Sequence, residues 1–150
     1  MNEIDQFWQE FCRKNNLTNV SYKEAFQFGA SPGWLASLVV EGKKTATTSG
    51  YVFYELENEE LPKKGDYSIV LDESNQPVAV IQVQSVDVLP MNEVSEEFAL
   101  AEGEGDYNFW WHAHEEFFTN ELKPYGKTFS PDLIVVCERF VNLTLKKPSC

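Results

Sequence analysis

The sequence predicts a single α+β domain whose strands are mostly antiparallel. Its 150 residues, 43% of them hydrophobic and 14% aromatic, are enough to bury one core. Segments with apolar residues at helical spacing alternate with segments rich in Val, Ile and Thr. Short connections join several of the expected strands, which favours antiparallel pairing. No repeat, low-complexity segment or linker divides residues 1–150.

Helices are expected where apolar periodicity coincides with capping residues. Apolar residues from Ile4 onward repeat at helical spacing, and Ser21-Tyr22-Lys23-Glu24 has the form of a capping box. These two helices would form an N-terminal extension of about residues 1–30. Ser31-Pro32 is typical of a helix start, and Gly42 of a helix end. We expect helices over residues 4–14, 21–26, 31–42, about 92–101 and about 106–122.

Strands are expected where β-branched and aromatic residues gather between turn signals. The turns contain Pro62 and Gly65, then residues 72–77, and finally Pro124-Tyr125-Gly126. The expected strands cover residues 45–54, 66–71, 78–88 and 133–145.

Charge limits the partners that the surface can bind. The formal net charge is −12, whereas binding to a long polyanion draws its free energy from Lys and Arg side chains that release counterions. We therefore expect no duplex DNA partner. A local basic pocket could still bind a nucleotide or a short RNA.

The composition favours a cytoplasmic protein with no membrane partner. No run of about 18 apolar residues is present, and the acidic N-terminus lacks the basic-then-apolar order of a signal peptide. Cys12, Cys137 and Cys150 are odd in number and widely spaced, which suits a reducing compartment. Nothing in the sequence fixes the oligomeric state.

The densest chemistry lies at a helix-to-strand junction, Gly42-Lys43-Lys44-Thr45-Ala46-Thr47-Thr48-Ser49. A lysine desolvated in a cleft can act as a base, and a threonine hydroxyl that it activates can act as a nucleophile. A carboxylate such as Glu102 could pass the proton to a leaving amine. Lys44, Thr47 and Glu102 are therefore the candidate catalytic residues.

Two residues beside this junction have both a functional and a structural interpretation. Trp34 could stack on a base at the mouth of the cleft, or it could pack in the core. Lys43 could bind phosphate, or it could only complement the negative end of the preceding helix.

The second unusual stretch is Glu102-Gly103-Glu104-Gly105-Asp106. Its carboxylates suit a hard cation, but the simpler interpretation is an acidic turn in which Asp106 caps the next helix. His114 shares a helix face with Trp111 and Phe118 and is expected to be a core residue with a satisfied ring nitrogen. Phosphate loops, dinucleotide motifs and zinc spacings are missing from the sequence, which excludes only the commonest cofactor enzymes. We expect no cofactor and no metal.

These motifs resemble a known family. Gly42 to Thr47 is similar to the G-x-K-x-x-T signature of ASCH domains, and the similarity extends over roughly residues 34–141, including Phe98 to Asp106 and Trp110-Trp111. The resemblance implies a bacterial ASCH protein with a PUA-like, mostly antiparallel β-barrel and flanking helices.

The family also implies a class of ligand. PUA-like barrels commonly bind RNA, and a small bacterial relative hydrolyses N4-acetylcytidine with a lysine, a threonine and a glutamate that fall here on Lys44, Thr47 and Glu102. The signature often carries a basic residue two positions after the threonine, where this chain has Ser49. Losing that bidentate contact favours a small ligand over a long RNA. The residues expected to bind the ligand are Trp34, Lys43, Ser49, Tyr51 and Asp106.

Three functional hypotheses follow from these residues. The first is a small amidohydrolase that acts on a modified nucleoside such as N4-acetylcytidine. The second is a module that binds RNA or a nucleotide without chemistry, which requires a positive island on the acidic surface. The third is a protein-interaction domain, in which Lys44 would be paired to a carboxylate and no pocket would exist.

Overall fold

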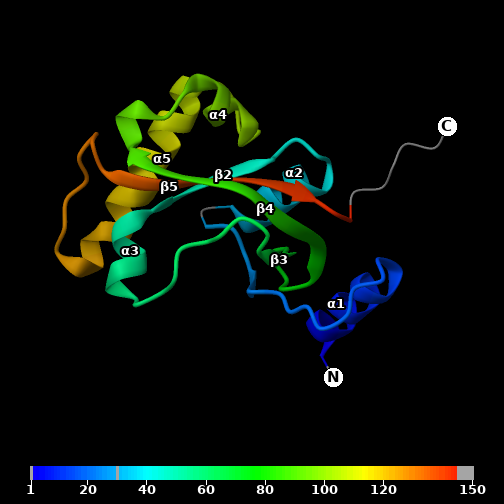
Figure 1. The fold of residues 1–150 in the computed structure, drawn as a ribbon. Helices are drawn as coiled ribbons and strands as arrows, with labels where there is room; N and C mark the ends of the chain where they lie inside the picture. The colour runs from blue at the N-terminus through cyan, green and yellow to red at the C-terminus, as the bar shows by residue number, and fades with distance from the viewer. Residues whose placement is uncertain (1, 30, 145–150) are drawn as a thin grey trace.

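The sheet is the centre of the fold. A computed structural model of the chain describes residues 2–29 and 31–144, and in it five strands form one curled sheet in the order β1-β3-β4-β5-β2 (Figure 1). The β1–β3 pair is parallel, and the other three pairs are antiparallel. The strands are β1 (Glu24–Phe26), β2 (Ala46–Gly50), β3 (Tyr67–Leu71), β4 (Pro77–Pro90) and β5 (Ile134–Asn142). The expected α+β class with mostly antiparallel strands is confirmed, and the barrel is an open half-barrel.

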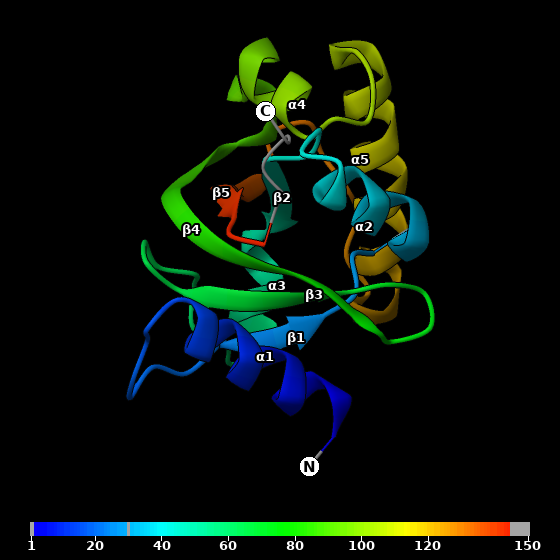
Figure 2. The same cartoon turned by 90° about the vertical axis from the view of Figure 1, so that its right-hand side faces the viewer.

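Helices cover the sheet from two sides. Figure 2 shows α1 against β1 and β3 at one end of the molecule, with α2, α4 and α5 at the other. Two short 3-10 helices, Met91–Glu93 and Lys123–Tyr125, flank the segment from α4 to α5. The α-helices are α1 (Glu3–Lys14), α2 (Pro32–Val40), α3 (Tyr51–Leu56), α4 (Glu96–Ala101) and α5 (Tyr107–Leu122).

Helices α4 and α5 begin at capping side chains, whereas Ser31 precedes α2 without a capping hydrogen bond from its side chain. The side chain of Ser95 accepts a hydrogen bond from Phe98 N at 3.1 Å, and that of Asp106 accepts one from Phe109 N at 2.8 Å. Gly42 follows α2 with φ of 79°, the left-handed conformation that glycine adopts without strain. These caps fix both ends of the segments that carry the site.

Two predicted elements are wrong. Residues 24–26 form strand β1 instead of a capped helix, because Glu24 to Phe26 pair in parallel with β3. Tyr51 begins helix α3 instead of continuing the strand from residue 45. A Cβ atom on Gly50 would lie 2.7 Å from the Phe53 ring, so this glycine permits the tight turn. The predicted end of the last strand, Leu145, lies outside the described residues.

Strand β3 separates two parts of the core. Ile69 and Leu71 pack with Trp8 and Phe11 of α1 in one buried cluster. Val70 points the other way, into the cluster beneath α2, as the period of two of a strand requires. Ser68 shares the face of Val70 and therefore points toward the inside of the curled sheet.

Within the described part of the chain, no helix is both long and apolar enough to cross a membrane. Cys12 and Cys137 are free thiols, and Cys150 lies outside the described residues.

Candidate functional site

Backbone contacts bring the lysine junction against the acidic turn after α4. Thr45 N donates to Ala101 O at 2.8 Å, and Thr45 O accepts from Phe140 N at 3.0 Å. Gly103 has φ of 77°, and a Cβ atom there would lie 2.5 Å from the carbonyl oxygen of Lys43. Only glycine fits this close approach. The turn therefore delivers Glu102 to the start of β2.

Lys44 and Glu102 form a buried ion pair. Lys44 Nζ lies 3.0 Å from Glu102 Oε1 and also donates to Ala46 O at 2.8 Å. Their exposed fractions are 2% and 1%. A buried pair is costly to desolvate and is retained only with good geometry and further hydrogen bonds.

The second carboxylate oxygen of Glu102 collects the remaining partners. Thr48 Oγ1 donates to Glu102 Oε2 at 2.6 Å, and the indole nitrogen of Trp110 donates to the same atom. His114 Nε2 lies 3.4 Å from it. His114 Nδ1 lies 2.8 Å from the carbonyl oxygen of Trp110, which can only accept, so Nδ1 carries a proton.

These contacts set the protonation of the cluster. Burial raises the pKa of Glu102, but the charge of Lys44 and the hydrogen bond from His114 outweigh it, and the pKa lies well below its usual range. Burial lowers the pKa of His114, but Glu102 and the Trp110 carbonyl raise it above the ordinary value. Burial is the main reason that the pKa of Glu104 is raised. At neutral pH Glu102 is therefore ionised.

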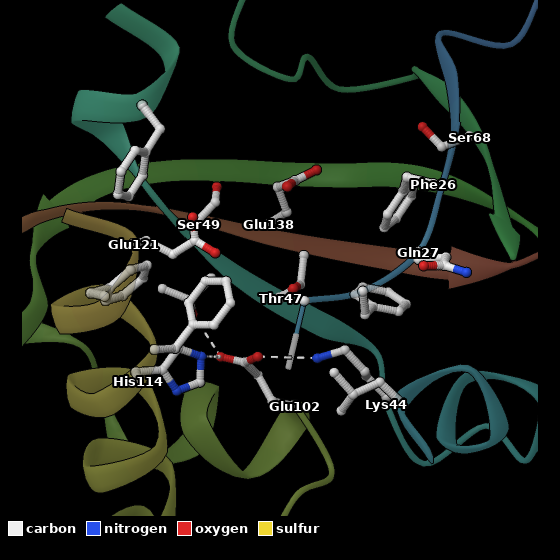
Figure 3. Close-up of a pocket in the computed structure, with 18 of the residues that line it drawn as sticks. Phe26, Gln27, Lys44, Thr47, Ser49, Ser68, Glu102, His114, Glu121 and Glu138 are labelled. Carbon is white, nitrogen blue, oxygen red and sulfur yellow. Dashed lines mark hydrogen bonds and ion pairs between the residues drawn. The ribbon is translucent and has the colours of Figure 1, made fainter. Parts of the chain in front are cut away.

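A cavity of about 370 Å³ opens beside this cluster, a size typical of small-molecule sites. It lies between β2, β5, the β1–β3 edge and α5, and Figure 3 shows side chains of these elements converging on it. A second cavity of about 260 Å³ adjoins it and shares Glu24, Tyr54, Ser68 and Glu138 among its lining residues. Seven glutamates line the larger cavity: Glu24, Glu57, Glu59, Glu102, Glu104, Glu121 and Glu138.

The three candidate catalytic residues all line this cavity. Lys44 and Glu102 are in direct contact, whereas Thr47 is half-buried and lines the same cavity. Thr47 pairs with Glu138 across β2 and β5, so their side chains point to the same face of the sheet. The threonine that touches Glu102 is the next one, Thr48.

The expected ligand-binding residues divide into two groups. Ser49 lines the cavity, and its hydroxyl lies 2.9 Å from that of Tyr54. The other four lie outside the lining of the larger cavity. Trp34 is 45% exposed, and Lys43 pairs with Glu41 at 3.2 Å. Tyr51 is the first residue of α3, and Asp106 caps α5.

Sequence reasoning missed several residues of the site. Thr48 stands beside Thr47 in the same motif, but its contact with Glu102 depends on which face of β2 each residue occupies. Trp110 is a helix residue of the kind that ordinarily packs in the core, but its buried indole N–H also needs an acceptor, which Glu102 supplies. Glu138 gave no signal at all, because its place in the cavity arises from the curl of the sheet.

Glu102, Glu104 and His114 are also a candidate metal-ligand set, since one ligand atom from each lies within 4.8 Å of the others. Their chemistry does not favour a cation. Both oxygens of Glu102 already accept hydrogen bonds, from Lys44, Thr48 and Trp110, and the Lys44 ammonium would repel a metal ion. The geometry is that of a hydrogen-bonded carboxylate.

The cavity also bears on two of the functional hypotheses. Lys44 is paired to a carboxylate, as the interaction-domain hypothesis requires, but that hypothesis also requires that no pocket exist. The glutamate lining is the reverse of the positive island that an RNA-binding module requires. Lys44 is the only lysine or arginine among the described residues that line the larger cavity.

Comparison with known proteins supplies the context for this geometry. The family model of the ASCH domain matches residues 24–144. No curated protein matches. A protein of family DUF984 from Enterococcus faecalis V583 is 42% identical with a TM-score of 0.86, covering 94% of this chain and 88% of its own. An ASCH domain from Lactobacillus crispatus JV V101 is 30% identical with a TM-score of 0.83, covering 95% of each chain.

Proposed function

The chain belongs to the ASCH domain family, and from this premise we propose that its cleft binds a small molecule of nucleoside size and hydrolyses an acyl amide on it, as in N4-acetylcytidine. The observation that carries the proposal is the buried Lys44–Glu102 ion pair in the wall of a cavity of about 370 Å³ that Thr47 also lines. Desolvation strengthens the electrostatic effect of such a pair on a bound substrate.

In the proposed reaction the Thr47 hydroxyl oxygen attacks the amide carbon, and Lys44 accepts the hydroxyl proton. Lys44 can accept this proton only after it has passed its own ammonium proton to Glu102, whose carboxylate oxygen lies 3.0 Å from Lys44 Nζ. Because the pKa of Glu102 is lowered, its protonated form is short-lived and a strong donor. It gives the proton to the amine as the C–N bond breaks, which restores the ionised carboxylate beside the Lys44 ammonium. Water hydrolyses the threonine ester, which releases the acid and restores the hydroxyl.

Thr48 and Trp110 act in this scheme as positioning residues. They bind the carboxylate oxygen of Glu102 that does not face Lys44, and so they fix the other oxygen on the ammonium. Their hydrogen bonds reach the reaction only through Glu102.

The acidic lining supports a ligand without phosphate groups. Seven glutamates line the larger cavity, and Lys44, the single lysine in the described lining, is already paired with Glu102. A phosphate group would therefore be repelled by the glutamates, and no unpaired lysine or arginine of this lining would offset that repulsion. The alternative is a site that binds such a molecule without turnover. It is supported by the fact that Lys44 already donates to Glu102 and Ala46.

The decisive experiment is a hydrolysis assay on N4-acetylcytidine with Thr47 variants. Thr47 is half-buried, so its substitution does not disturb the ion pair, whereas removing Lys44 or Glu102 leaves an unpaired buried charge. We expect Thr47→Val to lower kcat/KM by about 10³-fold or more and Thr47→Ser to stay within about tenfold of wild type. A wild type without turnover, or an active Thr47→Val variant, contradicts the hydrolase.

A further inference from the structure

The curl of the sheet places two carboxylates on facing walls of the cleft. Glu138 comes from β5, in the middle of one wall, and Glu24 comes from β1, at the opposite edge of the sheet. Both line the larger cavity and its 260 Å³ extension. Figure 3 draws Glu138 on the other side of Thr47 from the Glu102–Lys44 pair.

Neither carboxylate has a counter-ion. Within residues 2–29 and 31–144, neither Glu24 nor Glu138 forms an ion pair, and the two nearby lysines are engaged elsewhere. Lys44 pairs with Glu102. Lys23 Nζ donates to the carbonyl oxygens of Glu60 and Leu61 at 3.2 and 3.1 Å. Glu138 is half-buried and Glu24 is exposed, and when both are ionised they give this end of the cleft a negative charge that no ion pair neutralises.

Ser68 independently indicates a ligand at the same place. Its side chain is only 8% exposed, yet its hydroxyl has no hydrogen-bond partner among the described residues. Ser68 pairs with Glu24 in the β1–β3 register and lines both cavities. Among the described residues no fully buried side-chain oxygen lacks a hydrogen-bond partner, so the Ser68 oxygen is reached from the cavity although its residue is largely enclosed. The hydroxyl is therefore free to bond a group that enters the cleft.

Aromatic rings form the rest of the wall. Phe26, Phe28, Phe53 and Tyr54 all line the larger cavity. Carboxylates combined with ring faces recognise organic cations, because the carboxylates supply charge and the rings supply cation–π contact. A hard metal ion would instead need a cage of oxygen ligands.

We propose that the cleft holds a positively charged organic group, an ammonium, guanidinium or amidinium, between Glu138, Glu24 and Ser68. The group lies on the far side of Thr47 from the Lys44–Glu102 pair, so a ligand can occupy both ends of the cleft at once. This specificity goes beyond the proposed hydrolysis and does not depend on it, because the residues involved are different.

The test uses a matched pair of probes, benzamidine and benzamide. Benzamidine carries an amidinium that fits a carboxylate bidentately, whereas benzamide has nearly the same shape and no charge. Titration calorimetry at about pH 8 measures both affinities, and we expect benzamidine to bind the wild type about tenfold or more tighter than benzamide. Glu138→Gln should reduce the preference for benzamidine over benzamide to less than about threefold. Glu24→Gln should also reduce this preference. Glu96→Gln, on the exposed face of α4, is the control and should leave it unchanged.

The outcomes are separate from those of the hydrolase assay. Equal affinity for the two probes, no benzamidine binding at about 10 mM, or a preference that survives in the Glu138→Gln/Glu24→Gln double variant overturns the cation site. If the protein fails to cleave N4-acetylcytidine but still prefers benzamidine to benzamide, the hydrolase proposal is wrong and the cation-site proposal stands.

Discussion

Glu102 and Glu138 lie in one cleft, yet their surroundings shift their pKa values in opposite directions. Glu102 accepts hydrogen bonds from Lys44, Thr48 and Trp110, and the pKa of its carboxyl is lowered. Glu138 has no such partner, and burial, with the charge of Glu24, raises its pKa to about 7. At rest Glu102 is ionised at neutral pH, whereas Glu138 is a half-buried acid that titrates near neutral pH.

Glu138→Gln should therefore stabilise the protein above neutral pH. The folded state binds a proton at Glu138 more tightly than the unfolded state does, so between about pH 4.5 and about pH 7 the free energy of unfolding falls as pH rises. The loss amounts to about 3 kcal/mol at most, and glutamine removes it. Denaturant unfolding at about pH 8 should show the variant about 1–3 kcal/mol more stable.

The pH series supplies the control for this prediction. Below about pH 4.5 the wild-type carboxyl is protonated in both states, so the difference between the two proteins should nearly vanish there. Other charges act on Glu138 from neighbouring elements, and these belong to Glu24, Lys23, Asp66 and Lys44. A variant that is less stable than wild type at about pH 8 would mean that one of these groups compensates Glu138.

Part of this site could be predicted from the sequence, and part could not. Lys44, Thr47 and Glu102 combine reactive side-chain types with a recognisable motif, and they line one cavity. The contact of Thr48 with Glu102 required knowledge of which strand face each threonine occupies. Glu138 and Ser68 lie 70 residues apart and meet only through the order of strands in the sheet, a long-range property that local patterns do not encode.

At the scale of elements, α1 supports the site from behind. Trp8 and Phe11 of α1 pack on Ile69 and Leu71 of β3, while Ser68 of the same strand faces the cleft. Helix α1 lies outside the segment that the ASCH family model matches, residues 24–144, yet it covers the back of a strand that carries the proposed cation site.

Trp8→Ala should lower the stability of the whole domain. Trp8 is 7% exposed, and truncating a buried tryptophan costs about 3–5 kcal/mol. Thermal unfolding measures the loss, and Gln9→Ala, at an exposed position of the same helix, should change the midpoint little. If Trp8→Ala leaves the melting temperature unchanged, α1 is only loosely attached to β3.

Elements with strong local signals were predicted well, and those fixed by tertiary pairing were not. Helices α4 and α5 begin at Ser95 and Asp106, both recognisable as caps. The capping box at residues 21–24 predicted a helix that does not form. Pairing with β3 stabilises residues 24–26 more than a short helix would. Tyr51 has the strand preference of an aromatic residue, but the tight turn at Gly50 begins α3 there.

At the scale of the whole molecule, the charge of the surface and the charge of the cleft agree. The net charge is −12, and the larger cavity is lined by seven glutamates and one lysine. The negative surface would attract a cationic ligand from a distance, and the negative lining of the cleft would then bind it. A polyanion would be repelled at both stages, because it needs lysines and arginines to displace its counterions.

We therefore expect single-stranded RNA and duplex DNA to bind only weakly, with dissociation constants above about 10⁻⁴ M at physiological salt. Fluorescence anisotropy with labelled oligonucleotides measures this, and lowering the salt should not produce the steep gain in affinity that counterion release gives. Benzamidine provides the comparison, since its attraction to the cleft should strengthen at low salt. Tight oligonucleotide binding that weakens with added salt would locate a basic surface away from the cleft and would revive the RNA-binding hypothesis. If both nucleic acids bind weakly and benzamidine binds clearly, the acidic cleft selects cationic ligands over nucleic acids and so determines the ligand class of this protein.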